Sequence, residues 1–184
     1  MIMKATTLAI LLGVSLAADA QDETQAAQTS LPPVCQTDPE FKAFHFWVGD
    51  WKVVGFKGEQ PAGKNKISVV ENGCAMVEEW TDIFGGTGQS LNYYNPMTKK
   101  WRQVWVSAGA GGNAIDYEGG MVDGSMVLEG TIWFYAQKKS APFRGTWTPL
   151  EDGSVRQFFE QYEPEKETWV PLFEAKYVRQ DRAG

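Results

Sequence analysis

Turn signals recur at short, regular intervals along most of this chain, and this spacing restricts the fold more than any other feature. The runs between them are short and rich in Val, Trp, Tyr, Phe and Thr, which is typical of β-strands joined by hairpins. No long stretch has the period of an amphipathic helix. The turn signals are Glu71-Asn72-Gly73, Gly85-Gly86, Asn95-Pro96, Gly109 to Asn113, Asp123-Gly124, Asp152-Gly153 and Glu163-Pro164. The sequence therefore predicts an all-β protein.

The runs read as a meander of roughly eight to ten antiparallel strands. Closure into an up-and-down barrel would remove the two exposed edges of such a sheet, and a β-sandwich is the alternative. Pro171 lies inside the last run. Because proline cannot donate to a ladder, that strand should begin near Pro171 or lie at a seam. The sequence Asp38-Pro39-Glu40 resembles a helix cap and predicts a short helical segment over Pro39 to Phe46.

Two of the predicted strands carry a glutamine and a large aromatic residue two positions apart. Gln103 precedes Trp105 in one strand, and Gln157 precedes Phe159 in the other. Each pair shares a face, because alternate residues of a strand point to opposite sides. A buried amide without partners costs about 1–3 kcal/mol. Mixed faces of this kind suit a barrel that holds a ligand. The alternative places both glutamines in solvent, with the valines and Phe158 inside.

Other strands show a similar mixture of polar and aromatic residues on one face. Glu78 shares a face with Trp80, and Asn92 with Tyr94. Arg144 would be a natural partner for Glu78 or for an anionic ligand group if it pointed inward. We therefore expect a pocket that contacts a ligand through these residues. The candidate ligand-binding residues are Trp80, Asn92, Tyr94, Gln103, Trp105, Arg144, Gln157 and Phe159.

The first part of the sequence has the features of an export signal. Lys4 precedes a short apolar run from Leu8 to Ala17, and Ala18-Asp19-Ala20 offers small residues for cleavage before Gln21. The run is too short to span a bilayer well. Residues 21–38 are predicted to be a flexible leader because they are polar and lack a hydrophobic period. A single barrel domain then covers 39–182. We expect a periplasmic or secreted protein, with an uncleaved anchor as the alternative.

The formal net charge is −6, and removal of residues 1–20 takes away one lysine and one aspartate. An acidic chain without a basic cluster argues against nucleic acid and anionic membranes as partners. Export permits a disulfide between Cys35 and Cys74, and two buried thiols are the alternative. Two cysteines and one histidine are too few for a structural zinc site. No cofactor is expected, and the oligomeric state is left open.

Several segments together resemble a known family. "FHFWVGDW" (44–51) contains Gly49-Asp50-Trp51, which looks like the Gly-x-Trp that begins the first strand of lipocalins and other calycins. "NGCAMVEEW", "SLNYYNPMTKKWRQVWV" and "EDGSVRQFFEQ" follow in order. This series resembles a widespread bacterial family of unknown function whose members are small and often exported. The resemblance implies a lipocalin-like barrel in which Trp51 closes one end, and it implies no activity.

The nitrobindin-like barrels are a neighbouring possibility, and they hold haem through a histidine late in the chain. The only histidine here is His45, beside the Gly-x-Trp segment, so haem is not expected. Three hypotheses for function remain. The first is an exported barrel that binds a small, largely apolar molecule. The second is a cofactor-independent acid–base enzyme of the isomerase or cyclase type, working through Glu78. The third is an envelope interaction module with a filled barrel, acting through loops such as Asn113 to Tyr117.

Overall fold

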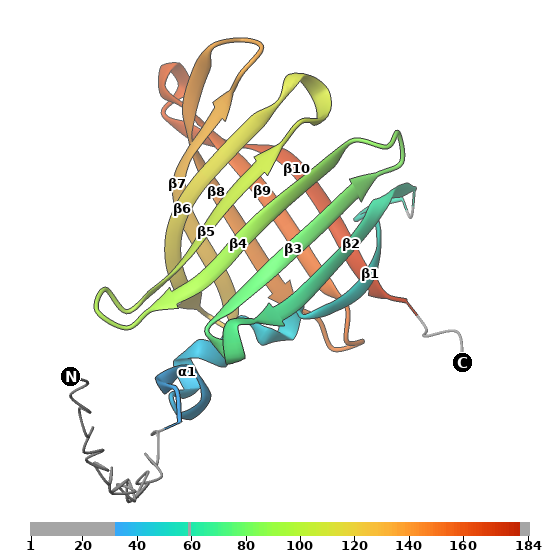
Figure 1. Cartoon of the computed structure of the whole chain (residues 1–184). Helices are drawn as coiled ribbons and strands as arrows, with labels where there is room; N and C mark the ends of the chain where they lie inside the picture. The colour runs from blue at the N-terminus through green and yellow to red at the C-terminus, as the bar shows by residue number, and fades with distance from the viewer. Residues whose placement is uncertain (1–31, 59, 181–184) are drawn as a thin grey trace, which may run out of the picture. The chain divides into compact units, whose positions relative to one another are not determined.

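Ten antiparallel strands form a closed up-and-down barrel in the computed structural model, which describes residues 32–58 and 60–180. Each strand pairs with its neighbours in sequence, and β1 pairs with β10 to close the wall (Figure 1). The strands are β1 (Gly49–Gly55), β2 (Pro61–Val70), β3 (Ala75–Asp82), β4 (Thr87–Asn95), β5 (Lys100–Ser107), β6 (Asn113–Val122), β7 (Ser125–Phe134), β8 (Lys139–Pro149), β9 (Val155–Glu163) and β10 (Thr168–Arg179). The predicted all-β barrel is confirmed.

The helical elements are all short. They are α1 (Val34–Thr37) and the 3₁₀ helices η1 (Pro39–Lys42), η2 (His45–Trp47), η3 (Glu71–Gly73), η4 (Gly109–Gly111) and η5 (Pro164–Lys166). The predicted helical segment at Pro39–Phe46 is therefore present as two 3₁₀ turns. The Asp38 side chain caps η1 by accepting a hydrogen bond from the Glu40 amide at 2.9 Å. Pro39 takes the first helical position, where its missing N–H costs nothing.

Strand parity sorts residues between the interior and the outer surface as the sequence predicts. In β5, Gln103 is buried and Val104 is exposed. In β9, Val155 and Gln157 are buried. The glutamines of both strands therefore point into the barrel. The alternative, with the valines of β5 inside, is wrong because Val104 and Val106 face outward.

The segment before β1 closes one end of the barrel. Phe41, Phe44 and Trp47 from η1 and its neighbouring turns are buried there, next to the helical segments seen below the strands in Figure 1. The indole nitrogen of Trp51 donates to the carbonyl oxygen of Trp47 at 2.8 Å. The indole nitrogen of Trp101 reaches the carbonyl of Glu40 at 3.1 Å. Trp51 thus lies at the closed end, as the resemblance to calycins implies.

A disulfide joins Cys35 in α1 to Cys74, which follows η3 between β2 and β3. The two Cα atoms are 4.8 Å apart. This bond fixes the last part of the predicted leader to the closed end of the barrel. Residues 1–31, which contain the predicted signal peptide and the start of the leader, lie outside the described residues.

The opposite end carries the loops 83–86, 108–112, 135–138 and 164–167. The two glycine-containing segments at Gly85–Gly88 and Gly109–Gly112 lie at this end. The wall here has a seam, because β1 pairs with β10 only from Arg179 to Ala175. The rest of β10 pairs with β9 alone, and its register shifts between Pro171 and Phe173. Proline is tolerated at this position because one side of the strand has no ladder.

Candidate functional site

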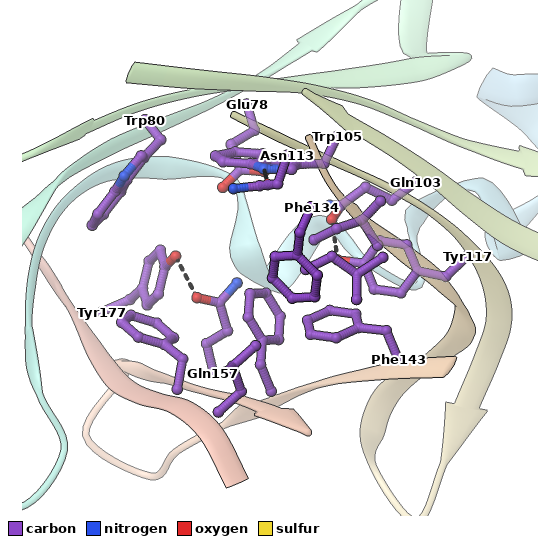
Figure 2. A pocket seen from close by; sticks show the side chains of 15 residues that line it. Glu78, Trp80, Gln103, Trp105, Asn113, Tyr117, Phe134, Phe143, Gln157 and Tyr177 are labelled. Carbon is purple, nitrogen blue, oxygen red and sulfur yellow. Dashed lines mark hydrogen bonds between the residues drawn. The ribbon is translucent and has the colours of Figure 1, made fainter. Parts of the chain in front are cut away.

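A cavity of about 240 Å³ lies inside the barrel, on the side of the open end. Figure 2 shows side chains from opposite walls converging on it. Its lining consists of Glu78, Trp80, Gln103, Trp105, Asn113, Ile115, Tyr117, Ile132, Phe134, Phe143, Gln157, Phe159, Leu172, Phe173 and Tyr177. Most of this surface is aromatic or aliphatic, and the described lining contains no lysine, arginine or histidine.

Two glycines make room for the tryptophans of the wall. A Cβ at Gly88 of β4 would overlap the ring of Trp105, and a Cβ at Gly63 of β2 would overlap the ring of Trp80. The side chains can therefore lie flat against the neighbouring backbone. The indole nitrogen of Trp105 donates to Oδ1 of Asn113 at 2.9 Å. This bond holds one tryptophan of the wall at a fixed orientation.

A continuous hydrogen-bonded network, which we call the polar belt, runs around the interior. Its members are Asn65, Glu78, Ser90, Asn92, Gln103, Tyr117, Gln157 and Tyr177. They come from strands on both sides of the seam, from β9 and β10 through β2 to β6. Most polar groups of the belt satisfy one another, which favours such a network in a core, and Oδ1 of Asn65 is buried without a partner among the described residues.

The first arm of the belt leads from Tyr117 to Glu78. The Tyr117 hydroxyl donates to Oε1 of Gln103, whose amide nitrogen donates to Oδ1 of Asn92. Asn92 Nδ2 then donates to the Ser90 hydroxyl at 2.9 Å. Ser90 Oγ donates to Oε2 of Glu78 at 2.7 Å. Every donor in this arm therefore points toward the carboxylate.

The second arm connects Glu78 with the last strands. Asn65 Nδ2 donates to Oε1 of Glu78 at 2.6 Å and lies 3.2 Å from the Tyr177 hydroxyl. The Tyr177 hydroxyl donates to Oε1 of Gln157 at 2.8 Å, a bond drawn in Figure 2. Both oxygens of Glu78 thus accept hydrogen bonds, and the carboxyl group is the point where the arms meet.

Burial dominates the electrostatics of Glu78. The residue is 4 % exposed, and desolvation raises the pKa of its carboxyl from 4.5 to about 7, although hydrogen bonds from Asn65 and Ser90 act in the opposite direction. The pKa values of Tyr117 and Tyr177 lie well above 10, first because of burial and then because of the charge on Glu78. Both phenols therefore remain protonated donors at neutral pH.

The structure brings most of the predicted site residues together. Trp80, Gln103, Trp105, Gln157 and Phe159 line the cavity, and so does Glu78. Asn92 is buried behind this lining and orients Gln103. The cavity therefore unites residues from β3, β5 and β9.

Two predicted residues lie elsewhere. Tyr94 is buried near the closed end, where its ring meets Phe41 edge-on with centroids 5.2 Å apart. Arg144 points outward: its guanidinium pairs with Glu160 at 2.8 Å and lies over the ring of Trp169. It cannot partner Glu78, because its neighbours on either side, Phe143 and Gly145, take the interior face. We therefore leave both residues out of the candidate site.

Sequence reasoning missed four polar side chains of the site. Tyr117 and Tyr177 supply the hydroxyl donors, Asn65 joins the belt across the seam, and Asn113 lines the cavity. The segment Asn113–Tyr117, interpreted as a loop, begins strand β6 instead. The alternation of Ile115 and Tyr117 with the polar residue Asp116 is typical of a strand and could have indicated that this segment is not a loop.

In comparisons with known proteins, no protein-family model matches the chain, and no curated protein matches it. Within the part of the chain that the structure describes, no helix combines the length and apolar character that crossing a bilayer requires. The same residues contain no group of three or more His, Cys, Asp or Glu side chains placed to hold a metal ion.

Proposed function

We propose that this protein is an exported barrel that binds a small, largely apolar molecule in its interior. The cavity carries the proposal: aromatic and aliphatic side chains form its walls, and a few polar groups converge on it from the belt. Ligand sites in proteins commonly have this combination of apolar walls and few placed polar groups. The volume of about 240 Å³ exceeds the roughly 150 Å³ of an engineered protein cavity that binds benzene. A ligand with one or two rings therefore fits.

Two further observations support the exported part of the proposal. The N-terminal sequence has the order of a secretory signal, with Lys4 before an apolar run and Ala18-Asp19-Ala20 after it. The disulfide between Cys35 and Cys74 is of the kind that persists in oxidising compartments. The barrel architecture also agrees with the resemblance to the lipocalin-like exported family. We propose that the chain is a member of that family.

Filling the cavity should remove binding. Ile132 lines the cavity from β7 and is buried, so Ile132→Trp places a large ring where the ligand would lie. We expect at least a tenfold loss of affinity. Overpacking should also lower the free energy of unfolding by about 1–3 kcal/mol. The matched control is Val106→Trp, which adds the same ring to an exposed position on the outer face of β5. Circular dichroism would verify that both variants fold.

Native mass spectrometry of protein purified from its own cells is the direct measurement. We expect the wild type and Val106→Trp to carry a non-covalent small molecule that is lost on denaturation, and Ile132→Trp to lack it. A titration with one- and two-ring aromatic compounds provides an independent readout. If no compound binds and no adduct appears on the wild type, or if Ile132→Trp binds as well as the control, the interior is not the binding site.

Glu78 favours a second candidate function, an acid–base enzyme in the same cavity. A carboxyl group that lines a cavity with a pKa of about 7 has both forms available at neutral pH, as a general acid or base requires. In D₂O, ionised Glu78 would take a proton from the methyl group beside the carbonyl of 2-acetylnaphthalene and return a deuteron. Deuterium incorporation, followed by NMR, should therefore be faster with the wild type than with Glu78→Gln. Equal rates for the two proteins would exclude this role.

A further inference from the structure

The three amide side chains that line the cavity share one arrangement. In each, the carbonyl oxygen already accepts a hydrogen bond from a neighbouring aromatic residue. Tyr177 donates to Gln157 at 2.8 Å, Trp105 donates to Asn113 at 2.9 Å, and Tyr117 donates to Gln103. An amide whose oxygen is occupied in this way has its nitrogen left for other partners.

The orientation of Asn113 follows from the chemistry of its partner. An indole N–H can donate and cannot accept. The atom of Asn113 that faces Trp105 must therefore be the oxygen, which leaves the amide nitrogen as the free end of this side chain.

The orientation of Gln103 is determined through Asn92. The backbone carbonyl of Met76 only accepts, so the Asn92 amide turns its nitrogen toward it, at 3.4 Å. The oxygen of Asn92 then faces Gln103, which must present its own nitrogen to that oxygen. The oxygen of Gln103 is consequently directed at the Tyr117 hydroxyl. One N–H of Gln103 is used in this chain, and a second remains.

The orientation of Gln157 is determined through Glu78. Oε1 of Glu78 accepts from Asn65 Nδ2, and the same nitrogen faces the Tyr177 oxygen at 3.2 Å. The proton of Tyr177 must then point onward to the oxygen of Gln157. Figure 2 shows the amide nitrogen of Gln157 directed into the cavity. No side chain or carbonyl among the described residues accepts a hydrogen bond from it.

We propose that the cavity selects a neutral aromatic ligand with a carbonyl-type acceptor oxygen, to which the amide N–H of Gln157 donates a hydrogen bond. This inference rests on the proposed function. An anionic ligand is disfavoured, because the described lining offers it no cation and places the carboxyl of Glu78 beside it. An acceptor oxygen satisfies the free amide donors, whereas a hydrocarbon would bury them unpaired. Tyr177 acts as a positioning residue, because it holds the oxygen of Gln157 away from the ligand.

A matched pair of probes tests the proposal. The compounds 2-acetylnaphthalene and 2-ethylnaphthalene have nearly the same shape and differ in the carbonyl oxygen. For the wild type we expect about tenfold tighter binding of the ketone, which is the contribution of one good hydrogen bond. In Gln157→Met the side chain keeps nearly the same length and shape, and no N–H or O–H donor remains at its end. The preference for the ketone should be lost there.

Two other variants distinguish the loss of this hydrogen bond from a folding defect. Tyr177→Phe should reduce the preference for the ketone, because the orientation of Gln157 is released. The preference is a ratio of two affinities in one variant, so a general weakening of binding does not change it. Gln89→Met, at an exposed position on β4, is the matched control and should retain the preference.

The failure modes are distinguishable. Equal affinity of the wild type for both naphthalenes overturns the ligand class and leaves the proposed function standing. A preference that persists in both Gln157→Met and Tyr177→Phe overturns the assignment to Gln157. Failure of both compounds to bind the wild type overturns this inference together with the interior binding site.

Discussion

Phe44→Ala is expected to lower the free energy of unfolding by about 3–5 kcal/mol, the usual cost of truncating a fully buried phenylalanine. Phe44 is 0 % exposed and lies at the centre of the closed end. Its ring stacks on Trp47 with centroids 5.1 Å apart and meets Trp147 edge-on at 5.2 Å. Trp101 contacts a further side of the ring, at 5.7 Å. Removing the ring leaves a cavity that these large neighbours cannot fill.

Urea unfolding followed by tryptophan fluorescence measures this effect. The matched control is Phe46→Ala, since Phe46 belongs to the same segment but is only partly buried. We expect the control to lose less than half as much stability as Phe44→Ala. Similar losses in the two variants, or a loss below about 1 kcal/mol for Phe44→Ala, would contradict the view that this segment is part of the core.

Glu78→Gln should remove a pH dependence of stability. The carboxyl pKa is about 7 in the folded protein and 4.5 ordinarily, so between these values the folded state keeps a proton that the unfolded state has released. The free energy of unfolding of the wild type should therefore fall as pH rises through this range. The full loss is about 3 kcal/mol, from a shift of roughly 2.5 pH units at 1.36 kcal/mol each. It is complete above pH 7 and absent below pH 4.5.

The measurement is the difference in unfolding free energy between the wild type and the variant at pH 4 and at pH 8. Subtraction cancels the contributions of other titrating groups. Relative to the wild type, Glu78→Gln should gain about 3 kcal/mol between the two pH values. Glu79→Gln is the control, because Glu79 is exposed on the outer face and lies 3.9 Å from Lys66. If the difference between Glu78→Gln and the wild type does not change with pH, the pKa of the buried carboxyl is not raised in the folded protein.

The alternation of residues along single strands could be predicted from the sequence. The shared faces of Gln103 with Trp105, Gln157 with Phe159, and Glu78 with Trp80 are local properties of an extended backbone. The same alternation excludes Arg144 from the interior once Phe143 is placed inside. The prediction that Arg144 meets a ligand relied on its charge and gave too little weight to its neighbours.

Contacts across the barrel could not be predicted in this way. Asn65 and Tyr177 are separated by 112 residues, and they meet only because β1 and β10 close the wall between them. Tyr94 shares a face with Asn92, yet it lies at the closed end, because depth along the barrel depends on strand stagger. A sequence shows which residues share a side of a strand and does not show their height in the barrel.

The sequence by itself determined the all-β class, which residues of each strand share a face, and the helical turns before β1. These depend on short-range geometry: the two-residue period of a strand, the turn residues and the cap at Asp38. The tertiary structure alone decided that a cavity remains, that Glu78 is buried without a cation, and that Tyr177 orients Gln157. These depend on the register between distant strands and on the volume that side chains leave between them, which no local pattern encodes.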